Sequence, residues 1–130
     1  MDRYKRSPLY HILISAVAII YVITGLRKIF SLGTVAADFE SWGYHPIFLY
    51  VFGVIEIAGA VALMIPRARI PGMVALGIIM LGAIATHLYA GEYYQVLLPL
   101  TLLLLLASLF VMSQDEIQDA TLREHDQANY

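Results

Sequence analysis

The chain has 130 residues, of which 60% are hydrophobic and 14% are charged, with a formal net charge of −2 and no cysteine. Soluble domains carry about 45–50% apolar and about 25% charged residues, so this composition argues against a water-soluble domain. The lack of cysteine excludes disulfide scaffolds, thiol nucleophiles and thiolate-held metal or iron–sulfur centres. The chain is not basic, which argues against nucleic acid as a partner.

Four apolar runs are long enough to cross a bilayer, whose ~30 Å hydrocarbon core needs about 20 mostly apolar helical residues. They are Leu9–Leu26, Ile47–Ile65, Ile70–Ala90 and Val96–Met112. Tight connections between runs make consecutive helices antiparallel neighbours. The sequence therefore predicts an all-α membrane protein, an up-down-up-down bundle of four transmembrane helices, with residues 1–130 as a single membrane domain.

The first run follows the basic segment MDRYKR and so resembles a secretory signal. It is too long for the apolar core of a signal peptide, and the nearest small-residue cleavage site lies beyond Arg27 and Lys28. We therefore predict a retained span.

The orientation follows from the basic residues of the short loops, because cytoplasmic loops carry an excess of Lys and Arg. One side of the membrane has only two basic residues, Arg27 and Lys28, which directly follow the first run. The other side holds six basic residues: Arg3, Lys5, Arg6, Arg67, Arg69 and Arg123. We predict a multi-pass protein of the bacterial inner membrane with both termini, including the acidic and solvated tail 113–130, in the cytoplasm.

The connection 29–46 is the only sizeable one. Its stretch TVAADFESWG predicts a short interfacial helix that places Phe39 and Trp42 at the level of the lipid headgroups. The same aromatic belt is expected to include Tyr89, Tyr93 and Tyr94. The leucine-rich fourth run has Leu on every side and is predicted to be mainly a lipid-facing wall.

Glu56 is the one charged residue inside an apolar run. A charge near the middle of a bilayer costs on the order of 2.5–3.5 kcal/mol, so Glu56 needs a partner or stays protonated. Helix side chains lean toward the N-terminus of their helix, which directs Lys28 and His87 inward and Glu56 outward. Glu56, Lys28 and His87 are therefore the candidate catalytic residues, in one zone of the outer half of the bundle.

The candidate lining of a pocket around this zone comes from three runs. Tyr21 and Thr24 precede Lys28 by about two turns and one turn. Small residues share the helix faces of Glu56 and His87, which allows close helix approach. The predicted cofactor-binding residues are Tyr21, Thr24, Phe52, Gly53, Met80 and Ala83.

A structural reading of the same residues stays open. Lys28 can extend its side chain to the interface, Glu56 can be a protonated hydrogen-bonding strut, and His87 can bond a carbonyl at a helix end. A haem held by two histidines is excluded, because His11 and His87 lie at opposite ends of their spans. The sequence shows no convincing metal site, no glycine-rich phosphate loop and no inverted repeat typical of a transporter.

Several short elements in fixed order resemble the DoxX-like family of small four-helix integral membrane proteins. The resemblance covers about residues 20–92 through the strings TGLRKIF, SWGYHPIFLYVFGVIEIAGAVALMIPRARIPG and MLGAIATHLYAGE. The matching positions are Gly25 with Lys28, Gly43 with Pro46, Gly53 with Glu56, Pro66 with Arg67, Gly72, and Ala83 with His87.

The resemblance implies that the chain is a membrane subunit associated with a quinone-linked oxidoreductase, with a polar quinone or lipid pocket. Some DoxX-like proteins are membrane subunits of a thiosulfate:quinone oxidoreductase, and others associate with soluble redox proteins. Lipid and other membrane or soluble redox subunits are the expected partners. A quinone is the expected ligand, with no covalently bound cofactor, haem or metal. The alternative is a non-catalytic accessory subunit of a larger membrane complex, or an assembly chaperone.

Overall fold

The structure is a computed structural model that describes residues 8–129, except for the side chains at positions 116, 117, 119 and 120. Within this range the chain forms six helical segments. They are α1 (Pro8–Ile29), α2 (Val35–Ser41), α3 (Pro46–Met64), α4 (Arg69–Tyr89), the 3₁₀ helix η1 (Tyr93–Val96) and α5 (Leu97–Ala128). Within that range there is no strand. Four segments are long and apolar enough to cross a membrane, namely α1, α3, α4 and Tyr93–Asp115. The predicted all-α class with four transmembrane helices is confirmed.

The ends of the helices follow local sequence signals. Pro46 opens α3 at a position where the missing N–H is not needed, and the His45 side chain accepts a hydrogen bond from the N–H of Ile47. At the other end of the chain, α5 continues through the predicted tail as one helix. Residues 113–128 contain no Gly or Pro to end it.

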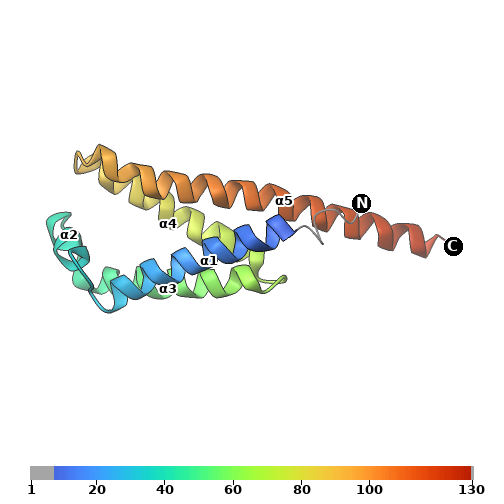
Figure 1. Cartoon of the computed structure of the whole chain (residues 1–130), viewed down its shortest axis with the longest axis horizontal. Coiled ribbons are helices and arrows are strands. Elements are labelled where there is room, and N and C mark those ends of the chain that lie inside the picture. The colour runs from blue at the N-terminus through green and yellow to red at the C-terminus, as the bar shows by residue number, and fades with distance from the viewer. Residues whose placement is uncertain (1–7, 130) are drawn as a thin grey trace.

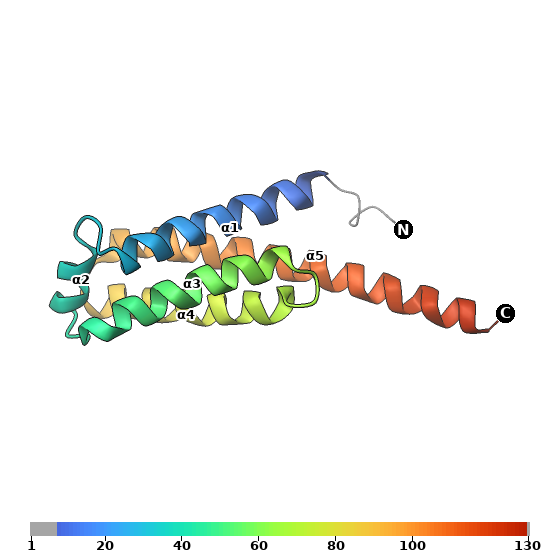
Figure 2. The ribbon, with the colours of Figure 1, turned by 90° about the horizontal axis from the view of Figure 1, so that it is seen from below.

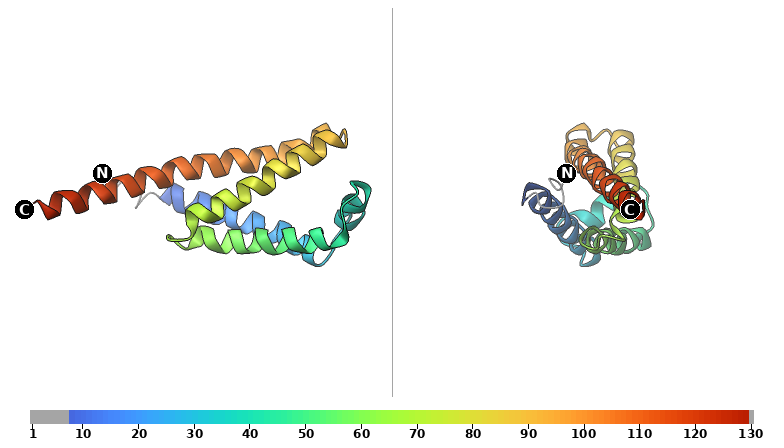
Figure 3. Two further views of the ribbon diagram at one scale, coloured as in Figure 1. Left: turned by 180° about the vertical axis from the view of Figure 1, so that it is seen from behind. Right: turned by 90° about the vertical axis from the view of Figure 1, so that its right-hand side faces the viewer.

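The four long helices run antiparallel around a ring in chain order (Figure 1). The most extensive packing is between α1 and α3, and α5 closes the ring against α1. The α1–α3 pair and the α4–α5 pair diverge toward one end, where α2 lies across the opening (Figure 3). We call this the α2 end. At the opposite tail end, α5 projects past the α3–α4 turn (Figure 2).

One face of α5 belongs to the core. Leu102, Leu106 and Leu109 are buried at intervals of four and three residues, so they form one stripe that packs into the bundle. The opposite face is open, with Leu97 and Leu104 61% and 60% exposed. The prediction of a lipid-facing wall therefore describes only half of this helix. Uniform leucine gave no sequence signal for the buried half.

Three helices share a buried polar cluster at the tail end. The Tyr10 hydroxyl is hydrogen-bonded to the Ser113 hydroxyl at 2.7 Å, and it accepts a hydrogen bond from the Arg69 guanidinium at 3.0 Å. Arg69 also donates to the carbonyl of Leu63 at 2.8 Å. Ser113, the first residue of the predicted tail, is therefore part of the bundle. These bonds tie α1, α4 and α5 together where the ring is closed.

The orientation in the membrane stays a prediction. Arg3, Lys5 and Arg6, which contribute to it, lie outside the described residues. The structure places the start of α1 and the end of α5 at the same end of the bundle (Figure 1). This agrees with an even number of spans.

Candidate functional site

Two glycines bring α1 and α3 into backbone contact near the α2 end. A Cβ added at Gly25 would lie 2.8 Å from the carbonyl oxygen of Gly53, and a Cβ at Gly53 would lie 2.8 Å from the carbonyl oxygen of Gly25. Such reciprocal contact is possible only for residues without a side chain, as in many membrane helix pairs. Lys28 and Glu56 each follow one of these glycines by three residues. The close approach of the backbones therefore brings these two side chains together.

Lys28 and Glu56 form a buried ion pair. The Lys28 ammonium donates to both carboxylate oxygens of Glu56, at 2.8 and 3.0 Å, and the Thr24 hydroxyl donates to one of them at 2.9 Å. The Glu56 side chain is 1% exposed and that of Lys28 is 19% exposed. Both oxygens of Glu56 thus accept hydrogen bonds, as a buried carboxylate requires. Lys28 is the member of the pair that remains accessible.

A cavity of about 450 Å³ lies beside this ion pair, where the two helix pairs diverge. Its polar end contains Lys28, Glu56 and Thr24, and its walls are mostly apolar. The wall side chains come from α2, α3, α4 and α5 and include Phe39, Phe52, Ile79, Met80, Ala83 and Leu102. Ligand pockets typically measure about 300–1,000 Å³ and combine apolar walls with a few polar groups. The cavity has both properties.

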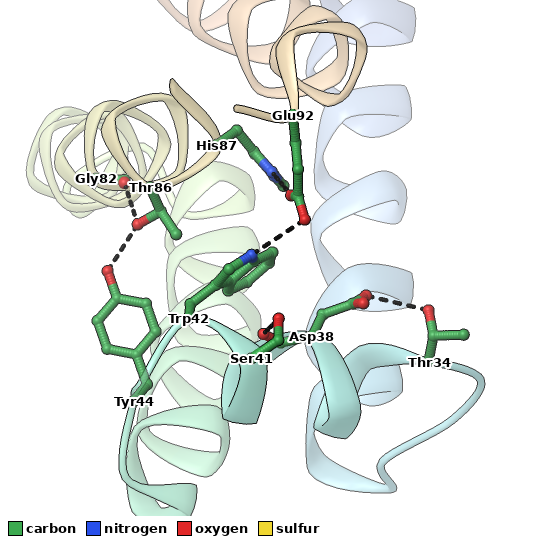
Figure 4. Close-up of polar contacts among 9 residues, drawn as sticks. All are labelled: Thr34, Asp38, Ser41, Trp42, Tyr44, Gly82, Thr86, His87 and Glu92. Atoms are coloured by element: carbon green, nitrogen blue, oxygen red, sulfur yellow. Dashed lines mark hydrogen bonds and ion pairs between the residues drawn. The ribbon is translucent and has the colours of Figure 1, made fainter. Parts of the chain in front are cut away.

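The cavity is covered at the α2 end by side chains that bridge the α2–α3 connection to the end of α4 (Figure 4). The Trp42 indole N–H donates to Glu92 at 3.3 Å, and Glu92 is also 2.8 Å from the Nδ1 of His87. The hydroxyls of Tyr44 and Thr86 are hydrogen-bonded at 2.6 Å. Trp42, Tyr44 and His87 all line the cavity. We call these contacts the cover bridges, and five side chains make them: Trp42, Tyr44, Thr86, His87 and Glu92.

Two similar helix ends position the cover bridges. Gly43 follows α2 with φ of 83°, and Gly91 follows α4 with φ of 75°. In each case the next N–H bonds back to the helix, from Tyr44 to Phe39 and from Glu92 to His87. This is the Schellman motif, which favours glycine because the left-handed conformation hinders other residues. The motif returns Glu92 to the side of His87.

A model of the DoxX-like family matches residues 12–109. The chain belongs to the DoxX-like family. The matched segment contains the ion pair, the cavity and the cover bridges. No curated protein and no solved structure matches the chain.

Most of the residues predicted for the site in this DoxX-like protein lie at the cavity. Lys28, Glu56 and His87 line it, but only the first two are bonded to each other, because His87 pairs with Glu92. The predicted lining residues Thr24, Phe52, Met80 and Ala83 are also at its surface.

Two predicted lining residues lie elsewhere. Gly53 is in the α1–α3 contact, where its missing side chain lets the helices touch. Tyr21 is fully buried in the core, and its hydroxyl has no hydrogen-bond partner within residues 8–129. Both lie between packed helices, so neither reaches the cavity that Lys28 and Glu56 line.

Sequence reasoning assigned Trp42 only to the lipid interface and gave no role to Tyr44, Thr86 or Glu92. The sequence did carry a signal for Tyr44 and Glu92, which follow Gly43 and Gly91. A glycine directly after a helix predicts that the next residue returns toward the last turn of that helix. Contacts across 42 and 50 residues, as between Tyr44 and Thr86 or Trp42 and Glu92, had no sequence signal.

The arrangement suits binding of an uncharged ligand with one polar end. The ion pair has no net charge, and Lys28 donates to the two Glu56 oxygens, which leaves the third N–H of the ammonium for a ligand. Among the described residues, no group of three or more His, Cys, Asp or Glu side chains lies together as a metal site would require.

Proposed function

We propose that this protein binds a quinone or another isoprenoid lipid in the cavity, as the membrane subunit of a quinone-linked oxidoreductase. The observation that carries the proposal is the ion pair of Lys28 and Glu56 at the polar end of an apolar cavity of about 450 Å³. A charge pair buried in a membrane protein is costly and is a candidate functional site by default.

The ligand contact is assigned to Lys28. Its ammonium is held by Glu56 and is partly exposed, so a free N–H is available to a ring carbonyl. Glu56 has both oxygens engaged and acts mainly as the group that holds the Lys28 ammonium in place. A ring carbonyl takes up protons when the quinone is reduced, and the Lys28 ammonium is the nearest proton donor that the pair offers to it.

The electrons have to come from another subunit. The chain has no cysteine, and its described residues offer no metal-binding group. A soluble or membrane redox partner is therefore part of the proposal. An accessory subunit that only fills space needs no cavity beside its buried acid, so the cavity favours the ligand-binding role.

Purification from native membranes tests the ligand. Quinones that co-purify with the protein are quantified by mass spectrometry for three versions: the native chain, Lys28→Met/Glu56→Gln, and Ser113→Ala. The double variant replaces the ion pair by neutral side chains of similar size, and Ser113→Ala alters the polar cluster at the tail end. We expect quinone with the native chain and Ser113→Ala and its loss from the double variant. No quinone with the native chain, or equal amounts in all three, contradicts the proposal.

The same preparations test the redox partner. We expect a protein with a redox cofactor to co-purify with the native chain. Quinone retention without such a partner would leave lipid binding in place and remove the oxidoreductase assignment.

A further inference from the structure

We infer that the cavity is loaded sideways from the bilayer through a gap between α3 and α4, bordered by Ile78 and Gly82. We call this gap the lateral portal. The inference rests on the proposed function and adds to it the path of the ligand and the place where its tail leaves the protein.

The end of the cavity that faces away from the bundle is covered. The cover bridges join the α2–α3 connection to the last turn of α4 and the residues after it, through Trp42–Glu92 and Tyr44–Thr86. Behind them the Phe39 ring packs against Trp42, Tyr44 and Phe52, with centroid distances of 5.3, 5.7 and 6.1 Å. A ligand that enters at this end has to break the bridges and part the aromatic rings, so the open route lies on a side of the bundle.

The close contacts between α3 and α4 lie toward the tail end. A Cβ at Gly59 would meet the Leu76 side chain at 2.7 Å, and a Cβ at Gly72 would meet Ala62 at 2.8 Å. Farther along α4, a Cβ at Gly82 would have no atom within 4 Å. Figure 3 shows that α3 and α4 diverge from these contacts toward the α2 end, and Gly82 belongs to the half of α4 nearer that end. The Tyr44–Thr86 bridge, one turn beyond Gly82, spans the same separation and forms the far edge of the gap.

Two residues at this gap are at once cavity wall and outer surface. Ile78 and Gly82, one helical turn apart, both line the cavity and are both exposed, Ile78 by 64%. A residue with both properties marks the place where a cavity reaches the surface. Because α3 and α4 are transmembrane segments, the surface reached here is the lipid face.

The chemistry of the ligand requires such an opening. A cavity of about 450 Å³ is near the lower end of the range for small-molecule pockets and holds a ring with the start of a tail. A long isoprenoid tail has to continue outside, and only the bilayer solvates it. A substitution that blocks the portal at Gly82 should therefore affect only ligands with a tail. A change at Lys28 should affect ligands with and without a tail, because Lys28 contacts the ring.

Another side of the cavity has two exposed lining residues, Leu98 of α5, which is 59% exposed, and Gln95 of η1. The remaining exposed lining residue is Tyr44, which belongs to the cover bridges. Gln95 lies one turn before Leu98, at the water-facing end of the bundle. The polar amide and the position at the end of α5 make this side the poorer path for an apolar tail. Substitution at Leu98 is therefore the competing arm of the test.

The test measures binding of two quinones to the purified full chain in lipid nanodiscs. One probe is a dimethoxy-methyl-benzoquinone with a decyl chain, and the other is the same ring without a chain. The variants are Gly82→Trp, Leu98→Trp, Lys28→Met/Glu56→Gln, and Ala85→Trp as the matched control. Ala85 is also exposed on α4, three residues from Gly82, and does not line the cavity. Open space around Gly82 lets the indole fit without disturbing the fold.

We expect Gly82→Trp to weaken binding of the decyl quinone by roughly tenfold or more, the factor that loss of about two buried methylene groups produces, and to spare the tail-less ring. Ala85→Trp should bind both probes as the native chain does, and Lys28→Met/Glu56→Gln should lose both. Equal weakening of both probes by Gly82→Trp, no effect of Gly82→Trp, or selective loss of the decyl quinone in Leu98→Trp overturns the portal while the proposed function stands. No binding of either probe by the native chain overturns the proposed function itself.

Discussion

Among the described residues, one buried polar cluster lies at the tail end and another lies toward the α2 end, and the two differ in what lies beside them. At the tail end, Tyr10, Ser113 and Arg69 bond to one another and to a carbonyl where the helices are tightly packed. Near the α2 end, Lys28, Glu56 and Thr24 bond to one another beside a cavity. Both clusters satisfy their polar groups. Burial of polar residues therefore does not by itself indicate a site, and the adjacent cavity is what distinguishes the second cluster.

The largest effect is expected when one member of the ion pair is removed. Glu56→Ala leaves the Lys28 ammonium without its counter-charge, and breaking a buried pair in this way costs about 3–5 kcal/mol of folding free energy. Lys28→Met/Glu56→Gln should recover most of this stability, because no lone charge remains, but it should not recover quinone binding. Unfolding in mixed micelles, followed by circular dichroism, measures the first result. A double variant as unstable as Glu56→Ala would contradict the account of the pair.

The next effect is expected at the glycine contact that brings the pair together. Gly53→Ala places a methyl group 2.8 Å from the carbonyl oxygen of Gly25, so α1 and α3 have to move apart. Overpacking of this kind costs about 1–3 kcal/mol. The same change at Gly82, where nothing lies within 4 Å, should alter stability by less than about 0.5 kcal/mol. Equal unfolding free energies for the two variants would show that the backbones do not touch at Gly53.

A smaller effect is expected at the tail end. Tyr10→Phe removes the hydroxyl that joins Ser113 and Arg69, and loss of a buried hydrogen-bonded group costs about 1–3 kcal/mol. The apolar ring remains, so packing is kept and the cost should fall in the lower part of this range. Quinone binding should equal that of the native chain. Weaker binding in this variant would remove the distinction between the two clusters.

The smallest effect is expected at the cover. Trp42→Phe keeps an aromatic ring over the cavity but removes the N–H that donates to Glu92. Loss of one hydrogen bond of this type is worth about 0.5–1.5 kcal/mol. Dissociation of a tailed quinone should stay unchanged if the tail leaves through the lateral portal. Faster dissociation, measured by exchange with labelled quinone, would assign the exit to the cover instead.

The sequence predicted the fold closely because each element has a local signal. Runs of apolar residues predicted α1, α3 and α4 to within a few residues, and the stretch TVAADFESWG predicted the short helix α2. The continuation of α5 to Ala128 was missed, since hydropathy marks where a helix leaves the membrane and not where it ends. The buried stripe of α5 was missed because leucine occupies both faces.

The part of the site that could be predicted consists of residues that are unusual for their place in the sequence. Glu56 was conspicuous as a lone acid in an apolar run, and Lys28 as a charge at the same level. The cavity had no sequence signal, because it arises from the divergence of two helix pairs. The partner of His87 depends on the left-handed turn at Gly91, which returns Glu92 to the helix end.

The most direct test of the central claim is to locate the bound ring by photo-crosslinking. The purified protein in nanodiscs is irradiated with an azido-quinone, and labelled peptides are identified by mass spectrometry. The account predicts labels on Thr24–Lys28 of α1, Phe52–Glu56 of α3 and the Ile78–His87 segment of α4, all suppressed by excess unlabelled quinone. Labels confined to the exposed face of α5, or labels that excess quinone does not suppress, would contradict it.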